Sequence, residues 1–197
     1  MTTEFWLDAK HIYWRKMEGQ KEYTVPGFTE IIKSYGLADN AFWTEAGRDE
    51  GTAIAQWMLF LFRGGVAVKQ ADPRIAGRVE AIKNFIRDTG FVFAGGETPL
   101  YSKTLRHGVM PDLWGFIGSF SWCIDGKRGA KSKTHKLQTA AQKLALLDNG
   151  FGAQKRGALY LKDDGTYKLD EHTDAGDEAR WRSIAYGYHA AQFYKEN

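Results

Sequence analysis

The chain has 197 residues, a formal net charge of +3 and a single cysteine, Cys123. One thiol excludes a disulfide framework, a cysteine-rich zinc site and a four-cysteine iron–sulfur cluster within the chain. Hydrophobic residues make up 43% of the sequence, including seven Trp and twelve Phe, which is ample for a packed core and excludes an intrinsically disordered chain.

Charge and targeting signals give broad expectations about location and partners. The small positive charge permits an anionic partner without demonstrating one. The first ten residues lack the basic and apolar regions of a signal peptide. The longest apolar run, Trp57–Phe62, is far too short to span a bilayer. We therefore expect a soluble cytoplasmic protein that does not enter a membrane.

The N-terminal part of the chain is predicted to be irregular at first and then helical. The first forty residues are aromatic and irregular, with a turn at Pro26-Gly27. A short helix is predicted over Phe28–Leu37, ending at Gly36. A longer helix is predicted from about Phe42 to Phe62, closed by Gly64-Gly65.

The middle of the chain changes from helix to strand. Asp72 as the cap and Pro73 as the first helical residue predict a helix start. Apolar residues then repeat at helical spacing until Gly90. Four strand-like segments follow, at residues 91–94, 97–101, 112–117 and 120–127.

The C-terminal part predicts a helix, a hairpin and a helix. The first helix covers about Leu137–Asp148 and is stopped by Asn149-Gly150. The hairpin joins residues 158–161 and 167–172 through the turn "KDDGT", and Asp174 or Asp177 caps the last helix. We predict one mixed α/β domain over residues 1–197, in which a helical part (1–70) precedes a core (71–197). That core has a mostly antiparallel central sheet of four to five strands flanked by helices.

The two strands at 112–127 carry charged residues in an otherwise apolar setting. A two-residue turn at Gly118-Ser119 fixes their register, and counting back along both strands places Asp112 opposite Asp125. Such facing residues have Cβ atoms roughly 4.5–5.5 Å apart. Lys127 shares a face with Asp125 because side chains alternate along a strand. The other face is a predicted core face, made of Leu113, Ile117, Phe120, Trp122 and Ile124.

Two carboxylates held this close repel one another, so one must take up a proton or both must share a cation. A hard divalent cation such as Mg²⁺ suits oxygen ligands, and a neighbouring ammonium can stabilise an anion. This combination is suited to hydrolysis of a phosphodiester. The alternative is a surface salt bridge between Lys127 and either aspartate at the end of a hairpin.

The same residues resemble a known family. Pro111-Asp112, followed by Asp125-Gly126-Lys127 after an apolar strand, resembles the signature of the PD-(D/E)XK nuclease superfamily. The run "KRG" that begins at Lys127 is similar to the Lys-Thr-Gly of its phage recombination exonuclease (lambda-exonuclease-like) branch. "LQTAAQKLAL" at 137–146 resembles the fourth motif of the family, with Gln138 in its first position. Further likeness in "VPGFTEIIKSYGL" and "RGALYLKDDGTYKL" extends the resemblance over roughly residues 25–181.

This resemblance implies a restriction-endonuclease-like core and a set of site residues. Asp112 and Asp125 would be ligands of Mg²⁺ or Mn²⁺. A metal-activated water would be the nucleophile, and Lys127 would position it and stabilise the developing charge. Glu97 resembles an acidic residue near the site of exonuclease relatives; the alternative is a solvated glutamate at a strand edge.

Two glutamines on the 137–148 helix complete this set. Gln138 would lie over the site. Gln142 lies one turn further on the same helix face, where relatives carry Tyr, and we expect it to contact DNA. The alternative for both is an ordinary polar helix face.

The sequence departs from the family pattern at one metal ligand. Relatives carry Gly-Thr-x-Val-His, whose His is a ligand, but here "GTAIA" at 51–55 places Ala55 at that position. Gln56 points away around the helix, while Glu45, Asp49 or Glu50 are alternatives that the pattern does not separate. The Gly expected two residues before Pro-Asp is Val109. These departures imply a one-metal or altered site and leave open a weakened catalyst.

A basic loop follows the signature. Beside a phosphodiester site it would hold a DNA backbone with salt-sensitive affinity; alone it would be an ordinary solvated loop. Its predicted DNA-binding residues are Arg128, Lys131, Lys133 and Lys136.

The resemblance thus implies a metal-dependent deoxyribonuclease, an exonuclease acting on double-stranded DNA ends, with endonuclease action open. A single-strand annealing protein and a homo-oligomer are implied as partners. The rival hypothesis is a DNA-binding or interaction protein of the same fold that has weakened or lost catalysis, which Ala55 favours.

Overall fold

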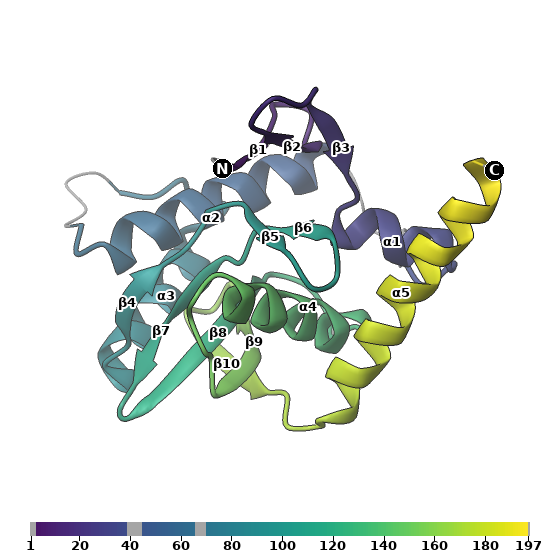
Figure 1. The fold of residues 1–197 in the computed structure, drawn as a ribbon. Coiled ribbons are helices and arrows are strands. Elements are labelled where there is room, and N and C mark those ends of the chain that lie inside the picture. Colours follow the sequence, from purple (N-terminus) through teal and green to yellow (C-terminus); the bar gives the residue numbers. More distant parts are fainter. Residues whose placement is uncertain (1–2, 39–44, 66–69, 197) are drawn as a thin grey trace.

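The computed structural model describes residues 3–38, 45–65 and 70–196, with the backbone alone for residues 45–48 and 196. The predicted fold class is confirmed, because the protein is mixed α/β with a mostly antiparallel five-stranded sheet flanked by helices (Figure 1). No helix within the described ranges is long and apolar enough to cross a membrane.

The central sheet has the strand order β10-β9-β8-β7-β4. Its strands are β4 (Val92–Gly95), β7 (Leu113–Ile117), β8 (Phe120–Lys127), β9 (Lys155–Leu161) and β10 (Tyr167–Glu171). All neighbouring pairs are antiparallel except β8 and β9, which are parallel. A parallel pair needs a crossover connection, and helix α4 (Thr134–Asp148) supplies it.

The predicted register of the central hairpin is confirmed. Ile117 pairs with Phe120 and Leu113 with Ile124, and Gly118 has the positive φ of 58° that a two-residue hairpin turn requires at this position. The predicted core face is wrong at Phe120, whose side chain is 48% exposed. Phe120 lies beside the turn, where the hairpin extends past the helices that cover the sheet.

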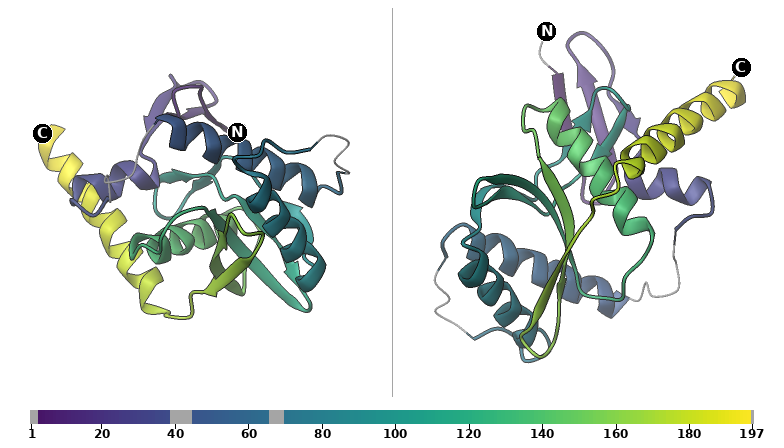
Figure 2. Two further views of the ribbon diagram at one scale, coloured as in Figure 1. Left: turned by 180° about the vertical axis from the view of Figure 1, so that it is seen from behind. Right: turned by 90° about the horizontal axis from the view of Figure 1, so that it is seen from below.

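Helices cover the two faces of this sheet. Helices α2 (Glu45–Phe62) and α3 (Ala76–Thr89) pack with Leu113, Trp122 and Ile124 into the largest apolar cluster. Helix α4 lies on the opposite face (Figure 2) and packs on Cys123 through Leu146. The alternate side chains of β8, which include Asp125 and Lys127, therefore face α4.

The predicted irregular N-terminus is wrong, because three strands form an antiparallel sheet there: β1 (Thr3–Leu7), β2 (Tyr13–Met17) and β3 (Tyr23–Val25). Trp6 and Trp14 face each other across β1 and β2 and stack with ring centroids 6.5 Å apart. Asp8 shapes the intervening turn, since its Oδ1 accepts hydrogen bonds from the backbone N–H of Lys10 and Ile12. The N-terminal part is therefore not purely helical.

Several element boundaries also differ from prediction. Helix α3 begins at Ala76 and not at Pro73, because the Asp72 carboxylate accepts the N–H of Arg74 in a turn that precedes the helix. The predicted strand at 97–101 is reduced to β5 (Leu100–Ser102). It pairs with the unpredicted β6 (His107–Val109). Helices α1 (Phe28–Ser34) and α5 (Gly176–Glu196) follow prediction closely, while the expected start of α2 at Phe42 lies outside the described residues.

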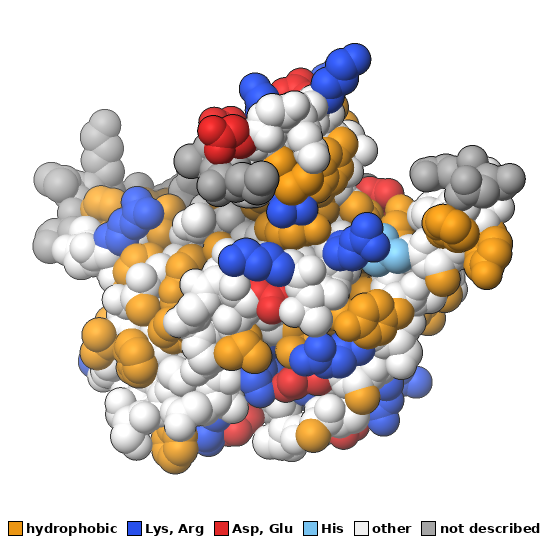
Figure 3. All heavy atoms as spheres, in the orientation of Figure 1, with side chains coloured by type: hydrophobic (Ala, Val, Ile, Leu, Met, Phe, Trp, Pro, Cys, Tyr) orange, Lys and Arg blue, Asp and Glu red, His pale blue; other side chains and the backbone are white. Residues whose placement is uncertain are grey.

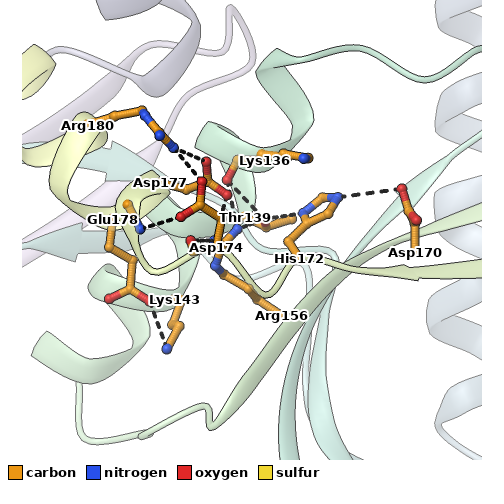
Figure 4. Close-up of polar contacts among 11 residues, drawn as sticks. Lys136, Thr139, Lys143, Arg156, Asp170, His172, Asp174, Asp177, Glu178 and Arg180 are labelled. Atoms are coloured by element: carbon orange, nitrogen blue, oxygen red, sulfur yellow. Dashed lines mark hydrogen bonds and ion pairs between the residues drawn. The ribbon is translucent and has the colours of Figure 1, made fainter.

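A buried ion pair ties α4 and α5 to the sheet (Figure 4). Arg156 of β9 donates to Asp177 Oδ2, at the start of α5, over 2.8 Å, and to the carbonyl oxygen of Lys136 in α4 over 3.0 Å. The side chains of Arg156 and Asp177 are only 3% and 6% exposed. Without Asp177 the Arg156 guanidinium would be left with neutral partners only, and without Arg156 the buried Asp177 carboxylate would keep only the exposed Arg180.

We expect Arg156→Met to lower the free energy of unfolding by about 3–5 kcal/mol, because it removes the only buried cation that pairs with the Asp177 carboxylate among the described residues. Urea denaturation monitored by circular dichroism measures the loss. Arg180→Met is the matched control: Arg180 also pairs with Asp177 but is 59% exposed, so its loss should be about 1 kcal/mol or less. Equal, small losses in both variants would contradict the structural role of Arg156.

A second interior feature is the histidine of β6. His107 is fully buried, and neither of its ring nitrogens has a hydrogen-bond partner of good geometry among the described residues. Its ring packs edge-on against Trp181, with centroids 5.0 Å apart. Burial lowers the pKa of His107 to about 4, so the folded protein holds it neutral.

The free energy of unfolding should fall as the pH drops, because the unfolded chain binds a proton at His107 near pH 6.5 and the folded protein only near pH 4. The expected contribution of this residue between these values is about 3 kcal/mol. Urea denaturation between about pH 7 and about pH 4 should show that His107→Phe reduces this pH dependence. His11→Asn, at an exposed turn residue, should leave it unchanged.

Candidate active site

The site is built around Asp125, near the end of β8. Its side chain is 1% exposed and faces α4. Gln142 and Gln138 both donate from Nε2 to Asp125 Oδ1, over 2.9 Å and 3.2 Å. Lys127 forms an ion pair with the other oxygen, Oδ2, and its ammonium donates to Gln138 Oε1 over 2.9 Å. The four side chains therefore form one closed polar network.

Helical spacing explains this network. Gln138 and Gln142 are one turn apart on α4, and the β8–α4–β9 crossover lays that face of the helix over the strand. The prediction that Gln138 lies over the site agrees with this placement. Gln142 was predicted to contact DNA, but its side chain is 2% exposed and its Oε1 lies 3.8 Å from the Cys123 thiol. Gln142 thus has little surface to offer a polynucleotide, although it lines the larger cleft, and its described polar contacts are with Asp125 and Cys123.

Asp112 reaches the same strand end from the start of β7. Its Oδ2 accepts a hydrogen bond of 2.6 Å from the backbone N–H of Gly126, the residue between Asp125 and Lys127. A Cβ on Gly126 would lie 2.9 Å from Met58 Cε and 3.2 Å from that carboxylate oxygen. Glycine at this position therefore leaves room for both the Asp112 carboxylate and the Met58 side chain of α2, which a larger residue would push aside.

The electrostatics of the site follow from its burial and its like charges. Burial, and then the Asp125 carboxylate, raise the pKa of Asp112 well above its usual range. Burial disfavours the Lys127 ammonium, yet Asp125 and Asp112 outweigh it and raise the pKa of Lys127. One ammonium thus stands against two carboxylates that repel each other.

Glu97 lies near this group. It was expected on a strand, but it precedes β5 and lies outside any strand. Its backbone is left-handed, with φ of 50°, and its N–H donates to the Pro111 carbonyl over 2.9 Å. Non-glycine residues adopt this conformation at a cost, and such strain often occurs at functional sites. Burial, and then Asp125, raise the pKa of the half-buried Glu97. Its setting does not fit the alternative of a solvated glutamate at a strand edge.

The donors present suit a hard cation with few protein ligands. Among the described residues, no three carboxylate, imidazole or thiol groups are close enough to form a ready-made metal site. Asp125 Oδ2 is buried, and its one contact among the described residues is the ion pair with the Lys127 ammonium, which lacks good hydrogen-bond geometry. Two carboxylates with such an oxygen fit Mg²⁺, which keeps several waters and often takes one or two carboxylates.

Ala55, which stands where the resembling family carries a histidine, also faces this site. Ala55 lines the same cleft of about 750 Å³ as Asp112 and Asp125. Of the proposed substitutes, Gln56 is exposed and Glu50 is paired with Arg78 over 3.3 Å. Asp49 lines the adjoining larger cleft, and the side chain of Glu45 lies outside the described residues.

The basic loop divides into paired and unpaired residues. Arg128 pairs with Glu50 over 3.3 Å and Lys131 with Asp170 over 2.7 Å. Lys133 and Lys136 are exposed and form no ion pair with a described residue. On the face seen in Figure 3, basic side chains are interspersed with acidic and hydrophobic ones and form no continuous basic band. Lys133 and Lys136 are thus the most available of the predicted DNA-binding cations.

A histidine of the basic run, His135, also lies at the site, although it was not predicted to act at the carboxylates. His135 lines the cleft with Asp125 and Lys127, and its Nδ1 lies 2.8 Å from the hydroxyl of Tyr160 on β9. The sequence signal was its spacing, since His135 precedes Gln138 by three residues and Gln142 by seven on one helix face.

Comparisons with known proteins give structural likenesses but no match in sequence. No protein-family model matches the chain, and no curated protein is similar to it in sequence. The crystal structure of an alkaline exonuclease (LHK-Exo) from Laribacter hongkongensis is similar, with a TM-score of 0.47 and 17% sequence identity. The match covers 85% of this chain and 87% of that one. The inference about the site therefore rests on its own side chains.

Asp112→Asn should stabilise the metal-free protein, because the amide still accepts the Gly126 N–H but no longer repels Asp125. The raised pKa means that the folded state binds the Asp112 proton more tightly than the unfolded chain. The wild type therefore loses stability as the pH rises through that pKa.

In EDTA, urea denaturation should show an advantage for Asp112→Asn that grows by about 1 kcal/mol or more from about pH 5 to about pH 8. Glu22→Gln, at an exposed residue, should show no such trend. An advantage that shrinks with rising pH would contradict the charge repulsion.

Proposed function

We propose that the protein is a metal-dependent deoxyribonuclease that hydrolyses phosphodiester bonds of DNA, and that it acts as an exonuclease on double-stranded ends. The observation that supports this most is the convergence of two carboxylates and one ammonium at the end of β8. Asp112 bonds the N–H of Gly126, while Lys127 contacts both Asp125 and Gln138. A surface salt bridge would need neither the burial of Asp125 nor the glutamine pair.

Asp112 and Asp125 would hold Mg²⁺ or Mn²⁺, with Glu97 close by. Bound there, the cation would polarise the phosphate and lower the pKa of a water molecule. The chain itself contributes three things. Gln142 orients Asp125, Gln138 restrains the Lys127 ammonium, and that ammonium can donate a remaining hydrogen to a phosphate oxygen as negative charge develops.

The substrate would be held by backbone contacts more than by base contacts. The cleft at the site continues past Gln138 into a larger cleft of about 1360 Å³. Exposed Lys133 and Lys136 would contact phosphates at its entrance, giving an affinity that falls with salt. Endonuclease action, a single-strand annealing partner and a homo-oligomer stay predictions from the sequence resemblance.

The rival function is a DNA-binding protein with lost or weakened catalysis. The observation in its favour is Ala55, which presents a methyl group to the cleft where the resembling family carries an imidazole ligand. Because Asp112, Asp125 and Lys127 are all retained, we prefer the catalytic function.

Lys127→Ala and Asp112→Ala should each abolish cleavage, because one removes the ammonium and the other a carboxylate of the site. Purified wild type and variants are mixed with linear and closed circular DNA in Mg²⁺, Mn²⁺ or EDTA. Loss of linear DNA alone indicates an exonuclease, and EDTA should stop it.

Lys155→Ala is the matched control, because Lys155 lies on the neighbouring strand and pairs with Glu171; it should cleave normally. Retained cleavage in both site variants would remove the site assignment. Binding without cleavage by the wild type would favour the rival.

A further inference from the structure

His135 belongs to the same face of α4 as the two glutamines that contact Asp125. It lines the cleft together with Asp125 and Lys127 and is half-buried. Its hydrogen-bond partners are Tyr160 on β9 and the backbone of Ser132, and neither bonds to Asp125 or Asp112. Its side chain is therefore fixed at the site without taking part in the Asp125 network.

These partners determine which ring nitrogen of His135 carries the proton. The backbone N–H of Ser132 can only donate, and it points at Nδ1 over 3.4 Å. The Tyr160 hydroxyl lies 2.8 Å from the same nitrogen. Since Nδ1 accepts, a neutral imidazole must carry its hydrogen on Nε2.

The ring is neutral near pH 7. Burial, and then the Lys127 ammonium, lower the pKa of His135 to about 4. Burial, and then Asp170 and Asp125, raise the pKa of Tyr160 to about 12, so its hydroxyl keeps its proton. Nε2–H forms no hydrogen bond with any described residue and is thus a neutral donor available in the cleft.

Resting on the function proposed above, we propose that His135 is a substrate-binding residue whose Nε2–H donates to a non-bridging phosphate oxygen of the DNA strand in the cleft. Tyr160 is its positioning residue. Tyr160 pairs with Lys127 in the parallel register of β8 and β9, so the hydroxyl that orients His135 is carried by the residue next to the ammonium. A donor without charge binds the phosphate and leaves the charge balance around Asp125 unchanged.

The proposal is tested by DNA binding in EDTA, measured by fluorescence anisotropy of a labelled duplex. His135→Ala should weaken binding about tenfold, the loss of one hydrogen bond to a charged group. His135→Gln, whose Nε2 carries a donor at a similar reach, should restore most of it. Tyr160→Phe should give a smaller loss, since the Ser132 N–H still favours the same tautomer. All variants should melt within a few degrees of the wild type.

Salt dependence separates this neutral contact from an ionic one. His135→Ala should leave the slope of log affinity against log salt unchanged, whereas Lys133→Ala should reduce it by about one. Duplexes with a single methylphosphonate then locate the contact. With the methylphosphonate at one position of the duplex, the affinity of the wild type should fall about tenfold, while that of His135→Ala should not fall further.

Failure of the His135 contact with phosphate can be distinguished from failure of the nuclease proposal. Any of four results would overturn the phosphate contact. His135→Ala could bind DNA as tightly as the wild type, or show a reduced salt slope. His135→Gln could fail to restore affinity, or no methylphosphonate position could remove the difference in affinity between the wild type and His135→Ala. Absence of DNA binding by the wild type would overturn it as well. A wild type that binds through His135 but cleaves no DNA in Mg²⁺ or Mn²⁺ would leave the contact standing and remove the nuclease.

Discussion

The contact between α4 and the Asp125 carboxylate is the constraint on which the site depends. An ionised group in the interior is tolerated only where hydrogen bonds and a counter-charge replace water. Gln138 and Gln142 provide the hydrogen bonds and Lys127 the charge. They can do so because β8 and β9 form a parallel pair, which needs a crossover connection, and the connecting helix α4 crosses the face on which Asp125 lies. The placement of α4 therefore supplies the glutamines that allow Asp125 to be buried.

The same site is under electrostatic stress. Asp112 is brought to the end of β8 by the Gly126 N–H, against the repulsion of Asp125, and Glu97 adds a third acid on a left-handed backbone. Replacing one of these acids by an amide would remove the repulsion without removing the hydrogen-bond acceptor. A cation bound between the acids would relieve their repulsion directly. The clustering of three acids would then be explained, because the protein would be more stable with the cation than without it.

Sequence reasoning was sufficient where a local rule determines geometry. A two-residue Gly-Ser turn and the alternation of a strand determine the register of β7 and β8, and four-residue spacing places both glutamines on one face. It was insufficient where partners distant in sequence decide. By its spacing, Gln142 belongs to an ordinary polar helix face. Only the folded structure shows that it lies over the buried Asp125 carboxylate. The N-terminal strands are short, mixed in polarity and joined by stacked aromatic residues, so their pattern does not distinguish them from loop.

The donors around the acids are mostly neutral, and this has a chemical reason. Amides from Gln138 and Gln142 donate hydrogen bonds to Asp125 without cancelling its charge, so the counter-charge comes from the Lys127 ammonium. Two of the loop cations are already compensated by Glu50 and Asp170, whereas Lys133 and Lys136 are exposed and form no ion pair with a described residue. A phosphodiester that approaches the acids needs hydrogen-bond donors there that do not compete with the cation for the carboxylates. A neutral imidazole whose Nδ1 is already occupied meets that requirement, whereas another ammonium would pair with an aspartate.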